Sequence, residues 1–243
     1  MQPSRIGLLS ARLAAPALAL ALCAALPARA GEPAAPPPPV IYPVGSEPQP
    51  DPSPVRWEGS VAVLGSVRVD SVAKTVSATG WVNQIEGPVE VFACGPKGKV
   101  HESVFVLALN PIDLQAALLL VGLEGGAPMP AVGEGPPAGS PLDVFVEWSA
   151  PDGETRRVRA ESCIWQNDKN EVLPESPWIF TGSVTKDGRF MAFSEESLVV
   201  TYWDPYAIVN LGHPSGADDE ALHANPRVLP PYETPVVVHF APR

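Results

Sequence analysis

The sequence is poor in positive charge, in cysteine and in histidine. Its 243 residues include 16 Lys and Arg against 27 Asp and Glu, a formal net charge of −11, with 3 Cys and 4 His. A protein that binds nucleic acid through the phosphate backbone needs a basic face. We therefore expect no nucleic-acid partner.

Complete motifs of several enzyme classes are also missing. There is no Cys-x-x-Cys, no dinucleotide-binding fingerprint and no Gly-x-Ser-x-Gly. The run from Gly95 to Lys99 has its glycines three apart and is followed by Val100, unlike a phosphate-binding loop. His101-Glu102 begins like a zinc-protease motif, but Phe105 occupies the second histidine position. No cofactor and no metal site are predicted.

Residues 1–30 have the pattern of a secretory signal peptide. Two arginines precede an apolar run of fourteen residues, 13–26, and small residues stand at Ala28 and Ala30. The run is too short to span a bilayer. We favour cleavage after Ala30 over lipid attachment at Cys23, because the bulky Leu22 precedes that cysteine. We expect an exported protein, periplasmic, envelope-bound or secreted, with no transmembrane helix after signal removal.

Proline, by contrast, is abundant, with 31 residues, and ten of them lie between positions 31 and 54. Such a segment cannot bury enough apolar surface to fold. Residues 31–55 are therefore predicted to be a Pro-rich disordered linker, and residues 56–243 a single domain. Loss of residues 1–30 removes three arginines and no acid, which takes the formal charge from −11 to −14.

The pattern of the remaining chain is mostly that of β-strands. Apolar residues alternate with polar ones over residues 61–69, 76–82, 142–148 and 198–203, with Gly, Pro and Asp at the turns between them. One helix is expected at about 111–121, because Asn110 is a good N-cap, Pro111 suits the first turn and Gly122 can end it. Its nearly continuous apolar composition predicts burial. The fold class is therefore α+β, mainly antiparallel sheet with one buried helix packed on it.

The segment from Cys94 to Ser103 holds the densest set of reactive side chains. If 95–99 is a hairpin loop, Cys94 pairs with Val100, and Lys99, His101 and Ser103 share the face opposite to Cys94 and Glu102. The candidate functional cluster is therefore Lys99, His101, Glu102 and Ser103, at the rim of the core. The structural alternative is a strand-end histidine, a solvated glutamate and a hydroxyl bonded to backbone. A metal site joining Cys94 and His101 would need a β-bulge.

Two further features carry weaker hypotheses. Without Cys23 the exported chain holds Cys94 and Cys163, and a disulfide is the expected state of such a pair outside the cytoplasm. Residues 213–223 contain two histidines and three acids, which suit a cation, although a solvated acidic loop is more common.

Several runs together resemble the YdjY-type domain of bacterial envelope and secreted proteins. They lie between residues 58 and 210, and Gly98-Lys99-Val100-His101-Glu102-Ser103 is the most specific; the others are 81–84, 87–94, 118–123 and 178–183. The resemblance implies export but no particular activity. Some relatives are described as ferredoxin-like, but two cysteines cannot supply four thiolates, so no iron–sulfur cluster is expected.

The sequence favours an exported accessory or binding module that is not an enzyme and whose partner is an unidentified envelope ligand or protein. The alternative is an enzyme or a metal or redox protein that uses the segment Lys99-His101-Glu102-Ser103, with His101 or Glu102 as acid or base. If Lys99, His101 and Ser103 point into solvent with no concavity around them, the enzyme alternative loses its basis.

Overall fold

The structure is a computed structural model that describes residues 48–243. The predicted signal peptide, Cys23 and residues 31–47 of the predicted linker lie outside the described residues. Residues 48–55 contain no helix or strand, and the first strand begins at Arg56.

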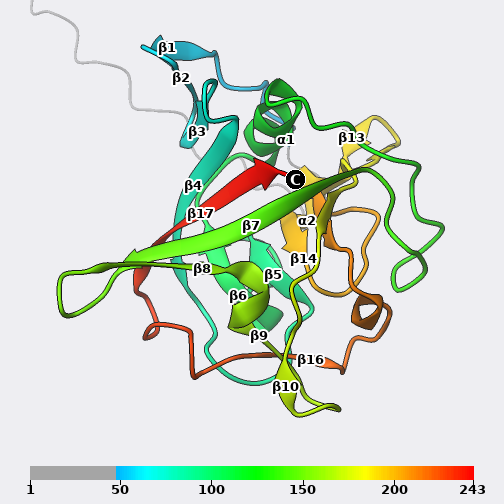
Figure 1. The fold of residues 1–243 in the computed structure, drawn as a ribbon. Coiled ribbons are helices and arrows are strands. Elements are labelled where there is room, and N and C mark those ends of the chain that lie inside the picture. Colours follow the sequence, from blue (N-terminus) through cyan, green and yellow to red (C-terminus); the bar gives the residue numbers. More distant parts are fainter. Residues whose placement is uncertain (1–47) are drawn as a thin grey trace, which may run out of the picture. The chain divides into compact units, whose positions relative to one another are not determined.

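Eight strands form a closed β-barrel. Their order around it is β4 (Thr75–Val82), β17 (Pro235–Pro242), β7 (Ser140–Ser149), β11 (Trp178–Phe180), β15 (Val209–Leu211), β14 (Ser197–Val200), β5 (Val91–Cys94) and β6 (Ser103–Leu107). The barrel closes because β6 pairs with β4 through Gly80 and Leu107, Trp81 and Val106, and Val82 and Phe105. Figure 1 shows β7 and β17 running side by side, as their antiparallel pairing requires. Two pairs of neighbours are parallel, β5 with β6 and β14 with β15.

The prediction of an α+β fold with a mainly antiparallel sheet and one buried helix packed on it is wrong. The protein is mostly β, and its main element is the closed barrel. The alternation of apolar residues identifies strands but does not report which strands pair. The contact between β4 and β6 that closes the barrel is therefore invisible in that pattern.

The barrel wall follows the expected alternation where its strands are long. Leu142, Val144 and Val146 of β7 are buried, and so are Val236, Val238 and Phe240 of β17. Phe92 joins the core aromatics, with ring centroids 5.1 Å from both Phe105 and Trp178. Strand β6 is buried along its whole length, with apolar neighbours on both faces. Burial of this apolar surface is the main force that holds the barrel together.

Smaller sheets surround the barrel. Strands β1 (Arg56–Glu58), β2 (Val61–Leu64) and β3 (Val67–Asp70) extend the sheet beyond β4 as an antiparallel meander. Strand β8 (Thr155–Arg159) pairs with β7 as an antiparallel hairpin. Strands β10 (Glu171–Val172), β9 (Ile164–Gln166) and β16 (Leu222–Ala224) form a three-stranded sheet. Strands β12 (Thr185–Lys186) and β13 (Arg189–Phe190) form a short hairpin.

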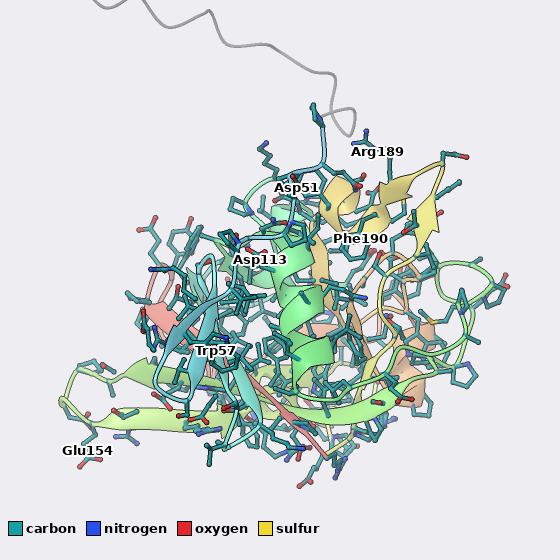
Figure 2. All side chains as sticks on the ribbon, turned by 90° about the horizontal axis from the view of Figure 1, so that it is seen from above. Asp51, Trp57, Asp113, Glu154, Arg189 and Phe190 are labelled. Atoms are coloured by element: carbon teal, nitrogen blue, oxygen red, sulfur yellow. The ribbon has the colours of Figure 1, made fainter. Side chains whose placement is uncertain are left out.

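Helix α1 (Pro111–Leu120) forms where it was predicted. The Asn110 side chain accepts a hydrogen bond from the backbone of Ile112 and caps the helix. Burial on all sides is not observed, since Leu119 and Leu120 are 51% and 54% exposed. The helix packs against β3 and α2 (Met191–Glu195) at one end of the barrel (Figures 1 and 2).

Residues before β1 attach to this helix. The backbone N–H and the hydroxyl of Ser53 both donate to the Asp113 carboxylate, each at 2.7 Å. Figure 2 shows the segment that carries Asp51 running past the end of α1 where Asp113 lies. Three short 3-10 helices complete the fold: η1 (Val100–Glu102), η2 (Ala160–Cys163) and η3 (Pro214–Ala217). No helix within residues 48–243 has the length and apolar character needed to cross a bilayer.

Candidate functional site

The chain from Cys94 to Ser103 does not form the predicted hairpin. Cys94 pairs with Val106 in a parallel arrangement, and residues 95–102 carry the chain back to the start of β6. Two backbone N–H groups fix this return: that of Gly95 donates to Glu196 O at 2.8 Å, and that of Lys97 donates to Glu196 Oε2 at 2.6 Å. The prediction that Lys99, His101 and Ser103 share one face of a strand is therefore wrong.

Asn83 holds the end of this returning segment. Its side-chain Nδ2 donates to Val100 O at 2.6 Å and to Ser103 O at 2.7 Å, and its backbone N–H donates to Val104 O at 2.8 Å. Residues 100–102 form η1 between these contacts. A 3-10 turn brings residues three apart to the same side. Lys99 and Glu102 therefore face each other.

Lys99 lies between two carboxylates. Its Nζ is 3.0 Å from Glu102 Oε1 and 3.2 Å from Glu90 Oε2. Burial would lower the pKa of Lys99, but the hydrogen bonds and charges of Glu102 and Glu90 outweigh it, so the pKa is raised above its usual value. Lys99 therefore stays charged at neutral pH, and one lysine compensates part of the charge of two glutamates.

His101 stands apart from this arrangement. Its side chain is 77% exposed, and its Nε2 lies 3.7 Å from Glu102 Oε2, which is beyond hydrogen-bond distance. The imidazole is thus at the mouth of the site rather than held by a bonded partner. Its place suits contact with a ligand, while no carboxylate orients it as a general base.

Ser103 is separated from the other three predicted residues by burial. It is fully buried, and its hydroxyl donates to Phe105 O at 2.8 Å. Its side chain also contacts the Cys94 thiol, whose pKa is raised by burial to about 11. The hydroxyl is committed to the backbone, as in the structural alternative considered for this residue.

The predicted disulfide is not formed. Cys94 and Cys163 are both free and buried. Cys94 belongs to a small apolar group with Val91, Val106 and Val200, while Cys163 ends η2 in the main core. Burial raises the pKa of Cys163 to about 12. Both thiols behave as small apolar side chains in this structure.

A cleft with a volume of about 360 Å³ opens beside Lys99. It is lined by Pro88, Glu90, His101, Glu102, Asp219 and Glu220, and we call it the acidic cleft. Its size falls in the range of small-molecule sites. Two segments that line the cleft are joined by backbone hydrogen bonding. Val89 N donates to Leu222 O at 3.0 Å, and Pro88 forms an antiparallel β-bridge with His223. The loop before β16 is thereby held against the start of β5.

Sequence reasoning found two of these lining residues, His101 and Glu102, and missed the others. Glu90 lies within a run quoted for its family pattern, and Asp219 and Glu220 belong to the acidic loop considered separately as a cation site. The missing information is the contact between residues 87–89 and 222–224, which joins segments more than 130 positions apart. His213 of the same loop lies outside this cleft, and its imidazole Nδ1 accepts a hydrogen bond from Ser215 N.

The lining of the cleft is mostly acidic. Four carboxylates face it, and Lys99 compensates two of them in part. Within residues 48–243 no three His, Cys, Asp or Glu side chains are grouped so as to hold a metal ion. The predicted residues Lys99, His101 and Glu102 lie together at or beside the cleft, whereas Ser103 and Cys94 do not line it.

The fold and this cleft define the class: a closed β-barrel protein with a carboxylate-rich cleft at the edge of the barrel wall. Within that class, the chain belongs to the YdjY domain family, because the model of that family, the YdjY domain, matches residues 67–241. The matched range begins with β3 and contains the whole barrel except Pro242, the last residue of β17. This confirms the family expected from the sequence runs. No curated protein and no solved structure matches the chain.

Proposed function

We propose that the protein is an exported, non-enzymatic binding module whose acidic cleft holds a positively charged group of its ligand. The observation that carries the proposal is the cleft of about 360 Å³ faced by Glu90, Glu102, Asp219 and Glu220. Opposite charges attract strongly where walls of low dielectric constant focus the field. A ligand ammonium or guanidinium group would therefore find its counter-charge here.

Export is part of this proposal and is supported by the sequence. Residues 1–30 have the charged start, apolar run and small-residue end of a secretory signal, and ten prolines follow before residue 55. A spacer of that composition suits a module held away from an attachment point.

The geometry favours binding over catalysis at the same residues. The Ser103 hydroxyl is buried and bonded to Phe105 O, so no neighbouring base can activate it. The Cys94 thiol, with its pKa raised by burial to about 11, is protonated at neutral pH. Lys99 is charged and paired with two glutamates. The enzyme alternative retains only the exposed His101 and Glu102.

The test uses lysinamide, which carries two positive charges and no carboxylate. We expect the wild-type chain to bind it at low salt, and Glu102→Gln to bind it about fivefold more weakly, a loss of about 1 kcal/mol. Glu90→Gln should weaken lysinamide binding by a similar factor. The affinity should fall as salt is added, because the cleft is open to solvent.

The matched control is Glu154→Gln, the same substitution at the tip of the β7–β8 hairpin, where Glu154 is exposed (Figure 2). It should leave lysinamide binding unchanged. Equal losses in Glu154→Gln and Glu102→Gln would show that only the overall charge matters and would contradict a specific cleft. Absence of lysinamide binding to the wild-type chain would contradict the proposal outright.

A further inference from the structure

A second pocket lies next to the acidic cleft, and its lining includes an arginine. Its volume is about 240 Å³, and its lining includes Glu86, Trp165, Asn170, His223, Asn225 and Arg227. We call it the Arg227 pocket. It lies on the three-stranded sheet, where Trp165 of β9 pairs directly with His223 of β16. These two ring side chains therefore stand side by side on one face of that sheet.

Arg227 is held in place but keeps its hydrogen-bonding groups available. Its guanidinium lies over the Trp165 ring, 4.6 Å from the centroid. Its backbone N–H donates to Asn225 Oδ1 at 3.2 Å, and Asn225, which is 1% exposed, is itself anchored by a bond from Nδ2 to Ser162 O at 2.8 Å. The cation–π contact restrains the guanidinium, and none of its N–H groups has a hydrogen-bond partner among residues 48–243.

No carboxylate among residues 48–243 forms an ion pair with Arg227, although the chain has far more acids than bases. Arg159 and Arg243, by comparison, are paired with Asp143 and Glu175. Glu86 lines the same pocket without reaching ion-pair distance. The Arg227 guanidinium, fixed beside a cavity, has the geometry that binds a carboxylate through two parallel hydrogen bonds.

The two pockets share a wall. On one segment of this wall, Gly87 lines the Arg227 pocket and the next residue, Pro88, lines the acidic cleft. On the facing segment, His223 lines the Arg227 pocket and Glu220 lines the acidic cleft. This wall is fixed by hydrogen bonds from Val89 N to Leu222 O at 3.0 Å and from Ala224 N to Gly87 O at 2.9 Å. Pro88 of the acidic cleft and His223 of the Arg227 pocket are partners in an antiparallel bridge, in which facing Cα atoms lie about 4.5–5.5 Å apart. Three residues of extended chain cover about 10 Å, so a short peptide is long enough to span this pair of residues.

We propose that the acidic cleft and the Arg227 pocket together bind a dipolar, peptide-like ligand, its ammonium group in the acidic cleft and its carboxylate on Arg227. The inference rests on the proposed function of the acidic cleft and adds the ligand class. Glu90 and Glu102 recognise the positive end, and Arg227 recognises the negative end. The separation of the two charges on the ligand, about that of a di- or tripeptide, decides which ligands fit.

The test compares the peptides Lys-Gly, Lys-Gly-Gly and Lys-Gly-Gly-Gly, each as the free acid and as the C-terminal amide. For the wild-type chain, at least one free acid should bind fivefold or more tightly than its amide. Arg227→Gln should abolish that difference while leaving lysinamide binding intact. Arg227→Lys, which keeps the charge but loses the planar fork, should retain part of it. Arg56→Gln, on the exposed strand β1, is the matched control and should preserve the difference in full.

The outcomes separate the two proposals. If lysinamide binds to the wild-type chain and Glu102→Gln weakens it, but acids and amides bind alike at every length, the dipolar ligand is refuted and the acidic cleft stands. A preference for the acid that survives Arg227→Gln also refutes the role of Arg227. If lysinamide does not bind at all, both proposals fail.

Discussion

Closure of the barrel depends on one glycine, and replacing it tests the fold most sharply. Gly80 of β4 faces Leu107 of β6 in the ladder that closes the barrel. A Cβ at position 80 would lie 2.2 Å from Val106 O and 2.5 Å from Leu107 Cδ2, whereas ordinary contact begins at 3.4 Å. In Gly80→Ala the two strands must therefore separate by about 1 Å.

The cost of that separation combines two effects. Overpacking of a tight site costs about 1–3 kcal/mol, and weakening a ladder hydrogen bond costs about 1 kcal/mol more. We expect Gly80→Ala to lower the free energy of unfolding by about 3 kcal/mol, and the melting temperature by about 6–12 °C for a domain of this size. Circular dichroism during heating measures it.

A neighbouring substitution on the same strand provides the control. Thr79 is exposed, and Thr79→Ala should cost less than about 1 kcal/mol. A Gly80→Ala variant as stable as the wild type would show that β4 and β6 do not approach closely. That result would refute the closed barrel.

Two further predictions concern buried groups. Burial raises the pKa of Cys94 to about 11 and that of Cys163 to about 12. The folded Cys23→Ser variant should therefore not react with a thiol reagent at pH 8, should react faster only as the pH rises toward 11, and should show two thiols after unfolding. A rapid reaction of the folded chain would contradict the burial. Arg159→Met leaves the buried carboxylate of Glu161, 3.0 Å away, without its charged partner, with only the Ser176 N–H still bonded to it, and should cost about 3 kcal/mol by chemical denaturation. Adding Glu161→Gln should recover at least about half of that loss, and strictly additive losses would contradict the pairing.

Local features of the fold could be predicted from the sequence. Asn110 and Pro111 mark the start of α1, and the turn at Pro151-Asp152-Gly153 marks the β7–β8 hairpin, because caps and turns depend on residues close together in the chain. Strand pairing depends on distant contacts. The same alternation suits a hairpin and a parallel pair, so the return of the chain at Gly95 could not be foreseen.

In the candidate site, too, contacts between neighbouring residues could be predicted and contacts between distant segments could not. The ion pair of Lys99 and Glu102 lies within four residues, and both were among the predicted residues. The partner Glu90 and the acids Asp219 and Glu220 reach the cleft only because residues 222–224 bond to residues 87–89. The prediction for Ser103 did not account for its burial, which follows from the apolar residues that cover both faces of β6.

The most direct test of the account is to map lysinamide binding on the folded chain by nuclear magnetic resonance. We expect backbone amide signals near Glu90, His101, Glu102 and Glu220 to shift as lysinamide is added. These shifts should disappear in the double variant Glu90→Gln/Glu102→Gln. Shifts that leave these four residues unmoved, or that persist unchanged in the double variant, would contradict the acidic cleft as a binding site.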